Sequence, residues 1–209
     1  MIKVFIVDDH SLIREGFRKI IEKENDIVVI GEAGNAKDFF SKFKTADCDL
    51  VVLDINLPDK NGLEVLKDVK IIKPQMHVLI LSMYPEERYA IRTFKAGASG
   101  YISKENAADT LIGAIRKVMA GGKHVSEELA QNIAFNLSHK GANVHDLLSD
   151  RELQILLLIG SGKSLHEIAE SLILSINTIN TYRTRVLEKM NLKSNADIIR
   201  YVIENKLVE

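Results

Sequence analysis

The sequence has little of what would place it outside the ordinary globular proteins. Its only cysteine, Cys48, cannot form an internal disulfide and has no Cys or His neighbour at metal-ligand spacing. No apolar run approaches the roughly 20 residues of a transmembrane helix, and a strand pattern starts at the N-terminus in place of a signal peptide. The net charge of −1 indicates neither nucleic acid nor membrane. We therefore expect a cytoplasmic globular protein.

The 209 residues, 46% of them apolar, suffice for one large domain or two ordinary ones. Up to Gly122, strand-like apolar runs alternate with segments of helical period, which predicts an α/β domain with a parallel sheet. From Asp146 on, only four short helical patterns follow. We predict an α/β domain over 1–122, a connecting helix and linker over 123–145, and an all-α four-helix domain over 146–209. The strands are expected at Val4–Val7, Ile27–Ile30, Leu50–Leu53, Val78–Leu81 and Tyr101–Ile102.

Two of these strands end in carboxylates. Asp8 and Asp9 follow the first strand, and Asp54 follows the third. In a doubly wound five-stranded sheet, ligands bind between the carboxyl ends of strands 1 and 3, so the three acids should meet. Each like-charge pair costs on the order of 4 kcal/mol at about 4 Å and an effective dielectric near 20. A cation is therefore expected, and all-oxygen ligation favours Mg²⁺, which also takes phosphate oxygens.

Two more polar side chains are expected at the same edge of the sheet. Ser82 ends the fourth strand and Lys104 follows the fifth. A hydroxyl and an ammonium beside a metal and a carboxylate can stabilise a phosphoryl group during its transfer, with the carboxylate as nucleophile. His10 lies next to two of the acids, but we interpret it as the start of the first helix, facing solvent.

The segments VDDH, VVLDINLPDKNG, LILSMY and GASGYISK resemble the receiver domain of bacterial two-component response regulators, over roughly residues 1 to 122. The resemblance implies a flavodoxin-like sheet of order 2-1-3-4-5. It implies that Asp54 accepts a phosphoryl group from a sensor histidine kinase. It also implies that Asp8 and Asp9 bind Mg²⁺, with Asp9, Asp54 and the backbone carbonyl of Asn56 as direct ligands.

The same resemblance gives roles to residues at the other strand ends. Ser82 and Lys104 correspond to the hydroxyl and the lysine that contact the phosphoryl group. Tyr101 corresponds to the aromatic residue that changes rotamer together with Ser82 on activation. In one departure, Glu105 follows the lysine where many receivers have a proline in a cis bond.

The C-terminal region has the pattern of a helix-turn-helix. The stretch SLHEIAESL begins with Ser164 and has Glu167 three residues later, a capping box that starts a helix. A turn at 173–175 leads to a second helix, which begins at Ser175 as its cap and ends near Lys189. In such a motif the second helix enters the major groove of DNA.

One face of this second helix is predicted to read DNA. At 100° per residue, Ile179, Val186 and Met190 share a side and must pack inward. The opposite side is small and polar, which suits contacts to base edges and phosphates. The predicted contacts are Ser175, Asn177, Asn180, Thr181, Arg183, Thr184, Arg185 and Lys189.

Residues 147 to 207 are similar to the LuxR-type DNA-binding domain, and the whole chain resembles a response regulator of the NarL/FixJ kind. This implies a phosphorylation-dependent transcription regulator, with double-stranded DNA and RNA polymerase as partners. Asn180 and Tyr182 replace a lysine and a histidine common in that family, so no base preference is carried over. From Gly141 on, eight basic residues stand against nine acidic ones, which predicts weak affinity per domain.

The last helix has two apolar stripes, Ala196, Ile199 and Ile203 on one side and Ile198 and Val202 beside them. One stripe can line the core of its own domain and the other is free. We predict that Ile198 and Val202 form the contact of a homodimer in the active protein. The alternative is that this stripe is buried within its own domain.

Three other classes of protein share part of this pattern. A haloacid-dehalogenase-like phosphohydrolase has its nucleophile in the first strand and an Asp two residues on, whereas here Asn56 follows Asp54 at that spacing. A P-loop nucleotidase is suggested by GSGKS at 160–164, but Leu157 stands where the motif needs Gly. The C-terminal region could instead be a four-helix protein-interaction module.

Overall fold

The computed structural model describes residues 1–83, 86–126, 144–205 and 207. The chain forms two compact units, Met1–Ser138 and His139–Glu209. Within the described ranges, no helix is both long and apolar enough to cross a membrane. The predicted connecting helix, SEELAQNIAFNL, lies outside the described residues except for Ser126. The predicted boundaries of the domains and linker therefore stay predictions.

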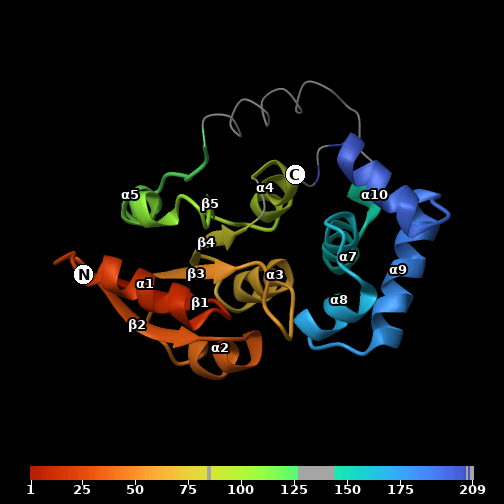
Figure 1. The fold of residues 1–209 in the computed structure, drawn as a ribbon. Coiled ribbons are helices and arrows are strands. Elements are labelled where there is room, and N and C mark those ends of the chain that lie inside the picture. The colour runs from red at the N-terminus through yellow and green to blue at the C-terminus, as the bar shows by residue number, and fades with distance from the viewer. Residues whose placement is uncertain (84–85, 127–143, 206, 208–209) are drawn as a thin grey trace. The chain divides into compact units, whose positions relative to one another are not determined.

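The first unit is an α/β domain whose five parallel strands have the order β2-β1-β3-β4-β5. This order confirms the predicted flavodoxin-like fold, and each strand was expected at its place within a few residues. The elements are β1 Ile2–Val7, α1 Ser11–Ile21, β2 Ile27–Ala33, α2 Ala36–Phe43, β3 Leu50–Asp54, α3 Gly62–Ile72, β4 His77–Ser82, α4 Glu86–Lys95, β5 Gly100–Ser103 and α5 Ala107–Met119 (Figure 1).

Helices cover both faces of this sheet (Figure 1). Successive strand side chains point to opposite faces, and the central strands β3 and β4 are buried on both. One face packs against α1 and α5, where Phe17 and Leu111 join the apolar core. On the other face, the ring of Phe5 packs edge-on against Phe39 of α2, with centroids 5.2 Å apart. The two covered faces explain why the strand sequences are continuous apolar runs and do not alternate.

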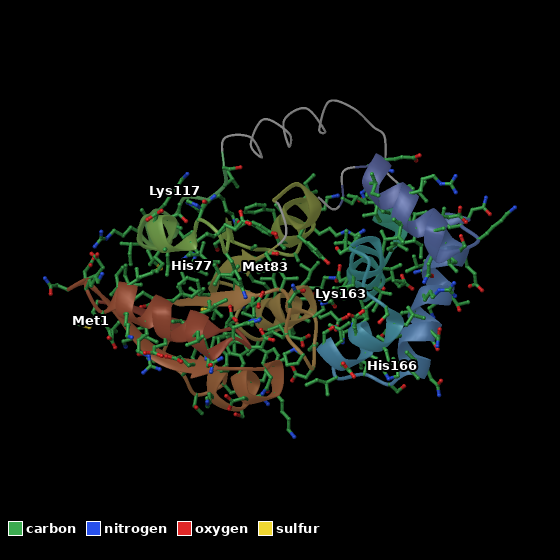
Figure 2. The ribbon with its side chains drawn as sticks, in the orientation of Figure 1. Met1, His77, Met83, Lys117, Lys163 and His166 are labelled. Carbon is green, nitrogen blue, oxygen red and sulfur yellow. The ribbon has the colours of Figure 1, made fainter. Side chains whose placement is uncertain are left out.

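The strand register brings the polar strand ends to one edge. Val7 pairs with Leu53, and Asp54 pairs with Leu81, so β1, β3 and β4 end almost level. Figure 2 labels His77, the first residue of β4, and Met83, which follows the last residue of β4 at the polar edge.

The loop after β3 folds back on the strand and starts α3. The amide N–H of Gly62 donates to the carbonyl of Ile55 (2.8 Å), and the side chain of Asn61 caps the helix by accepting from the N–H of Leu63. A Cβ on Gly62 would lie 2.6 Å from the Cα of Ile55 and would also meet the carbonyl of Asp54. Only glycine allows so close a return of the chain to the end of β3.

The second unit is helical in its described part. A short 3₁₀ helix is followed by four α-helices, and each α-helix begins after a serine whose side chain accepts a backbone N–H of the first turn. The capping box of Ser164 with Glu167 and the cap at Ser175 are confirmed. The elements are η1 Val144–Leu147, α7 Asp150–Gly160, α8 Leu165–Ser171, α9 Ile176–Met190 and α10 Asn195–Glu204.

Three of these helices end in the same way, with a left-handed residue whose own N–H and that of the next residue donate back to carbonyls of the helix. The left-handed residues are Gly162, Ile173 and Asn191, with φ of 81°, 49° and 54°. After α8, Ile173 donates to the carbonyl of Glu170 and Leu174 to that of Ala169. Glycine and asparagine tolerate this conformation, whereas a β-branched residue is an outlier there. The GSGKS stretch is thus the turn between α7 and α8.

The predicted dimer contact at Ile198 and Val202 is wrong, because both side chains are fully buried. Helix α10 packs on α7, and Val202 lies so close to Gly160 that a Cβ there would come within 2.6 Å of it. This is the alternative in which the stripe lines its own core. The exposed stripe of α10 is the other one, where Ile203 is 59% exposed.

Replacing Gly62 with alanine should destabilise the first unit by about 1–3 kcal/mol, the usual cost of inserting a methyl group where there is no room. Urea unfolding of the full chain measures this change. Gly16→Ala in α1 is the matched control, since nothing lies within 4 Å of its added Cβ. Because alanine is the better helix former by about 1 kcal/mol, the control should not lose stability. Equal stabilities for the two variants would contradict the role given to Gly62.

Candidate functional site

The structure brings the three predicted acids together. Asp8 and Asp9 follow β1, and Asp54 is the last residue of β3. One ligand atom from each of these carboxylates, together with a ring nitrogen of His10, lies within 4.8 Å of every other. Asp8 and Asp54 are fully buried, while Asp9 and His10 are exposed. The group therefore has a closed side within the sheet and an open side toward solvent.

A single ammonium group contacts the two buried acids. Lys104 follows β5, and its Nζ lies 2.7 Å from Oδ2 of Asp8 and 2.6 Å from Oδ2 of Asp54. Its side chain is only 4% exposed. The predicted meeting of Lys104 with the acids is thus observed in the structure. Three carboxylates against one ammonium leave negative charge uncompensated, which suits the binding of a divalent cation.

The titration of these groups follows from their burial and from one another. Burial raises the pKa of Asp54 to about 6, with Lys104 opposing this rise and the negative charge of Asp8 adding to it. Burial works against the charge of Lys104, but Asp54 and Asp8 outweigh it and raise the pKa of the ammonium. Lys104 therefore keeps its positive charge at neutral pH, and the raised pKa of Asp54 brings its protonation closer to neutral pH than that of an ordinary aspartate.

Of the other predicted residues, Asn56 contacts Asp54, while Ser82 and Tyr101 lie in the neighbouring strands β4 and β5. The backbone N–H of Asn56 donates to Oδ1 of Asp54 at 3.0 Å, so both carboxylate oxygens of Asp54 have a donor. Ser82 is buried at the end of β4, and its carbonyl accepts the N–H of Lys104 (2.8 Å). Tyr101 is buried in β5, and its backbone N–H donates to the carbonyl of His124 (3.1 Å).

The structure also shows anchoring residues that the sequence did not point to. Arg14 reaches back from α1, and its Nη1 donates to the backbone carbonyl of Asp8 at 2.6 Å. Asp59, in the loop after β3, accepts the N–H groups of Ala36 and Lys37 at 2.9 Å each. These contacts hold the two loops that carry the acids. Their sequence signal was slight, since an arginine on a helix and an aspartate in a turn are common.

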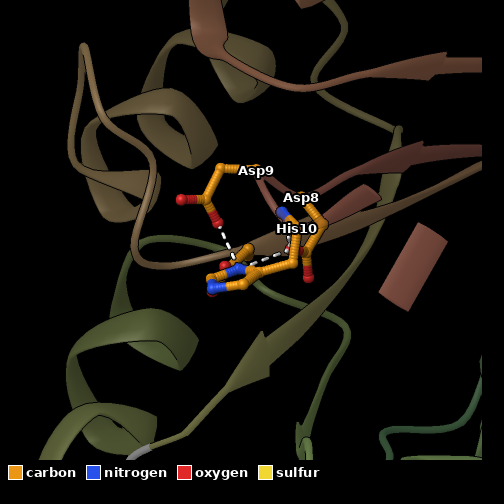
Figure 3. A group of neighbouring side chains, drawn as sticks. Asp8, Asp9 and His10 are labelled. Atoms are coloured by element: carbon orange, nitrogen blue, oxygen red, sulfur yellow. Dashed lines mark hydrogen bonds and ion pairs between the residues drawn. The ribbon is translucent and has the colours of Figure 1, made fainter. Parts of the chain in front are cut away.

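His10 differs from its prediction in one respect. It precedes α1 as its N-cap residue, and its side chain is 60% exposed, as expected for a helix start. Its ring, however, turns toward the acids: Nδ1 lies 2.6 Å from Oδ1 of Asp9 (Figure 3). The sequence could not reveal this, because the direction of the ring depends on its χ angles and on the position of Asp9.

The donor set of the acidic site fits a hard divalent cation. Carboxylate oxygens from two loops face a common point, and such oxygens are the ligands that Mg²⁺ prefers. A cation there would balance the charge that Lys104 leaves uncompensated. Asp8, Asp9 and Asp54 are the side chains that would hold it.

In the second unit, helix α9 has the predicted polarity. Ile179, Val186 and Met190 are buried, as expected for its inner face. The outer face is polar and mostly exposed. Exposed residues among the predicted DNA contacts are Ser175, Asn177, Asn180, Thr181, Thr184, Arg185 and Lys189.

Two of the predicted contacts, Arg183 and Lys189, bind residues of other helices of the unit. Nε of Arg183 donates to Oδ1 of Asn195, at the start of α10, at 2.5 Å. Nζ of Lys189 lies 2.6 Å from Oε2 of Glu152, in the first turn of α7. Both pairs fasten α9 to its neighbours, so a phosphate would compete with Asn195 or Glu152 for these cations. Arg185 reaches no carboxylate within its described surroundings; its guanidinium lies 5.9 Å from the ring of Tyr182.

An α/β unit with an acidic edge and a helix-turn-helix unit define a class of protein, the DNA-binding response regulators. Residues 4–116 match the family of response regulator receiver domains, and residues 146–202 match the luxR family of bacterial regulatory proteins. The chain belongs to the response regulators, of the NarL/FixJ type. Because members of this family are transcription regulators, the alternatives of a haloacid-dehalogenase-like phosphohydrolase and a P-loop nucleotidase are excluded.

Relatives match the chain over its whole length. It is 34% identical to the response regulator UvrY of Escherichia coli K12, covering 99% of this chain and 96% of UvrY. It is 32% identical to the response regulator GacA of Pseudomonas syringae pv. syringae, covering 100% and 99%. Among solved structures, RcsB of Salmonella enterica serovar Typhimurium bound to promoter rprA has a TM-score of 0.67 at 22% identity, covering 97% and 98%. That likeness shows a shared fold.

Replacing Lys104 with methionine should raise the pKa of Asp54 above its value of about 6, because the substitution removes the nearest positive charge and leaves Asp8 in place. A larger share of Asp54 would then be protonated at pH 7. NMR titration of the side-chain carboxyl carbons in metal-free protein measures this. Lys123→Met is the matched control, since the Nζ of Lys123 donates to the backbone carbonyl of Ala98. A pKa of Asp54 that stays unchanged or falls in Lys104→Met would contradict the charge assignment.

Proposed function

We propose that Asp54 accepts a phosphoryl group from a sensor histidine kinase, with Mg²⁺ as cofactor, and that this event controls dimerisation and DNA binding by the C-terminal unit. The observation that carries the proposal is the meeting of Asp9, Asp54 and Lys104 at one edge of the sheet. Few sites other than a phosphoryl-transfer site need a buried carboxylate between an ammonium and a cation-binding pair of acids.

The chemistry follows from the donors around Asp54. A carboxylate oxygen of Asp54 attacks the phosphorus, the bond between phosphorus and the donor's imidazole nitrogen breaks, and the imidazole leaves with the electron pair. Lys104 lies where it can neutralise charge on the phosphoryl oxygens, and the N–H of Asn56 holds the other carboxylate oxygen in place. Mg²⁺, bound by Asp8, Asp9, Asp54 and the carbonyl of Asn56, would supply further positive charge. No residue need act as a general base.

The switch would run through Ser82 and Tyr101. The N–H of Lys104 donates to the carbonyl of Ser82, so the two residues lie side by side at the ends of β4 and β5. Tyr101 lies two residues before Ser103, the β-sheet partner of Ser82. A change in its rotamer would alter the face formed by α4 and β5. Full conversion between two states requires roughly 5 kcal/mol of differential stabilisation, which a new charge amid this cluster can supply.

The C-terminal unit would bind double-stranded DNA through α9. The exposed Asn177, Asn180, Thr181 and Thr184 can meet base edges, and Ser175 and Arg185 can meet phosphates, while Arg183 and Lys189 would first leave their protein partners. Near-neutral charge in this region makes binding by one copy weak. A dimer places two such helices on adjacent half-sites.

We assign the dimer contact to the exposed stripe of α10 in place of the buried one. Ala196 and Ile203 are exposed and Ile199 is half-buried, so the stripe is available to a second copy. The same proposal includes the domain limits 1–122, 123–145 and 146–209. It also includes contact with RNA polymerase and a cytoplasmic location.

Asp54→Asn should abolish the effect of acetyl phosphate on DNA binding, because the amide oxygen is not a nucleophile for phosphorus. Gel shifts on sequences selected from a random DNA pool, with sedimentation for oligomeric state, provide the measurement. The donor should drive the wild type to a dimer and raise its affinity, whereas Asp54→Asn should stay as it is. Asp47→Asn, at a carboxylate 88% exposed, is the matched control and should respond like wild type. An Asp54→Asn protein whose DNA binding still rises with acetyl phosphate would eliminate Asp54 as the phosphoacceptor.

Ile203→Glu tests the dimer contact. An Ile203→Glu protein that still dimerises with acetyl phosphate would eliminate the contact at α10.

Arg185→Ala should weaken binding to all DNA sequences alike and reduce the slope of log affinity against log salt by about one unit, because the proposal places Arg185 on a phosphate. Titrations of the phosphorylated protein on selected DNA at several salt concentrations measure both quantities. Arg116→Ala on α5 removes an equal charge from the first unit, where Arg116 pairs with Glu24 and Asp26. Equal losses in the two variants would show that net charge, and not a contact of α9, sets the affinity.

A further inference from the structure

The side chain of His10 has no part in building the helix that it precedes. His10 is the N-cap residue of α1, yet its ring makes no capping hydrogen bond. The backbone does that work: the carbonyl of His10 accepts the N–H groups of Ile13 and Arg14, and its N–H donates to Oδ1 of Asp8 at 2.8 Å. The imidazole is therefore free to serve another purpose, and it points at the acidic site (Figure 3).

The position of the ring nitrogen matches that of a metal ligand. Neighbouring ligands around an ion with bond lengths near 2.1 Å lie about 3 Å apart, and opposite ones about 4.2 Å. Nδ1 of His10 lies 2.6 Å from Oδ1 of Asp9 and 3.3 Å from Oδ1 of Asp8. A ring nitrogen of His10 also lies within 4.8 Å of a carboxylate oxygen of Asp54. An ion held by the three acids would thus have the imidazole nitrogen in reach.

A nitrogen ligand changes which ions a carboxylate site favours. Mg²⁺ prefers oxygen and retains its water, whereas imidazole is a good ligand for Co²⁺, Ni²⁺ and Zn²⁺. We propose that His10 is a further protein ligand at this site through Nδ1, and that the site therefore binds Co²⁺, Ni²⁺ or Zn²⁺ more tightly than three carboxylates alone would. The inference rests on the proposed function, because it uses the same acids.

A simpler arrangement accounts for part of the geometry. The ring could donate a hydrogen bond to Asp9 as an ordinary surface pair, with a ring that stays 60% exposed. Such a pair would lower the affinity of the site for every ion alike, since the ring would have to leave Asp9 before any ion could bind there. If the ring is a ligand, its removal lowers the affinity for ions that accept nitrogen and leaves the affinity for Mg²⁺ unchanged.

The test compares Zn²⁺ and Mg²⁺ binding by calorimetry in the full chain. His10→Asn removes the imidazole and keeps a residue that is preferred at helix N-caps, so α1 should fold. We expect the variant to lose about tenfold or more in Zn²⁺ affinity, as even indirect partners of a metal affect affinity by 10–100-fold, and to keep its Mg²⁺ affinity within about twofold. His166→Ala is the matched control: this exposed histidine, labelled on α8 in Figure 2, belongs to the other unit.

The nitrogen can also be observed directly. In ¹⁵N spectra of the six histidine rings, Zn²⁺ should shift Nδ1 of His10 more than any other ring nitrogen, and Asp54→Asn should weaken that shift. Equal Zn²⁺ affinity in wild type and His10→Asn, or an equal loss for Zn²⁺ and Mg²⁺, would overturn the assignment of His10 alone. A wild type that binds Mg²⁺ no better than Asp54→Asn would overturn the metal site of the proposed function as well.

Discussion

Three carboxylates around one buried ammonium are the constraint on which the first unit depends. Asp8 and Asp54 have left water and depend on the Nζ of Lys104, and Asp9 adds a third negative charge at the surface. A buried charge cluster of this kind contributes little to stability by itself, because the cost of desolvation offsets the attraction. It persists where the surrounding fold fixes its members, and its excess of negative charge makes the site sensitive to cations and protons.

The fold supplies that fixation at each strand end. Register aligns β1, β3 and β4, Gly62 lets the loop after β3 return against Ile55, and Arg14 holds the carbonyl of Asp8. None of these features touches a ligand atom directly. Together they turn acids that are far apart in the sequence into one site at the carboxyl ends of the strands.

Much of this could be predicted from the sequence. The rest could not, and the reasons are physical. Strand ends and helix caps are local, so Asp54, Ser164 and Ser175 could be placed from neighbouring residues. Which stripe of α10 is buried depends on the partner helix. Gly160 of α7 leaves room for Val202, so the stripe of Val202 packs inward, against the prediction. The ring direction of His10 and the reach of Arg14 depend on rotamers and on distant backbone, which no pattern encodes. The whole-chain resemblance supplied roles that geometry alone would have left open.

The turn between α8 and α9 has a consequence for how the reading helix is aimed. Ile173 adopts a left-handed backbone that suits glycine, at a cost of about 1–3 kcal/mol. A bend that its own residue disfavours must be imposed by the packing of the helices on either side, here through buried Ile168, Leu172 and Ile179. The angle between α8 and α9 is thus set by the interior of the unit, so substitutions of buried side chains could change the direction of α9 while its exposed residues stay the same.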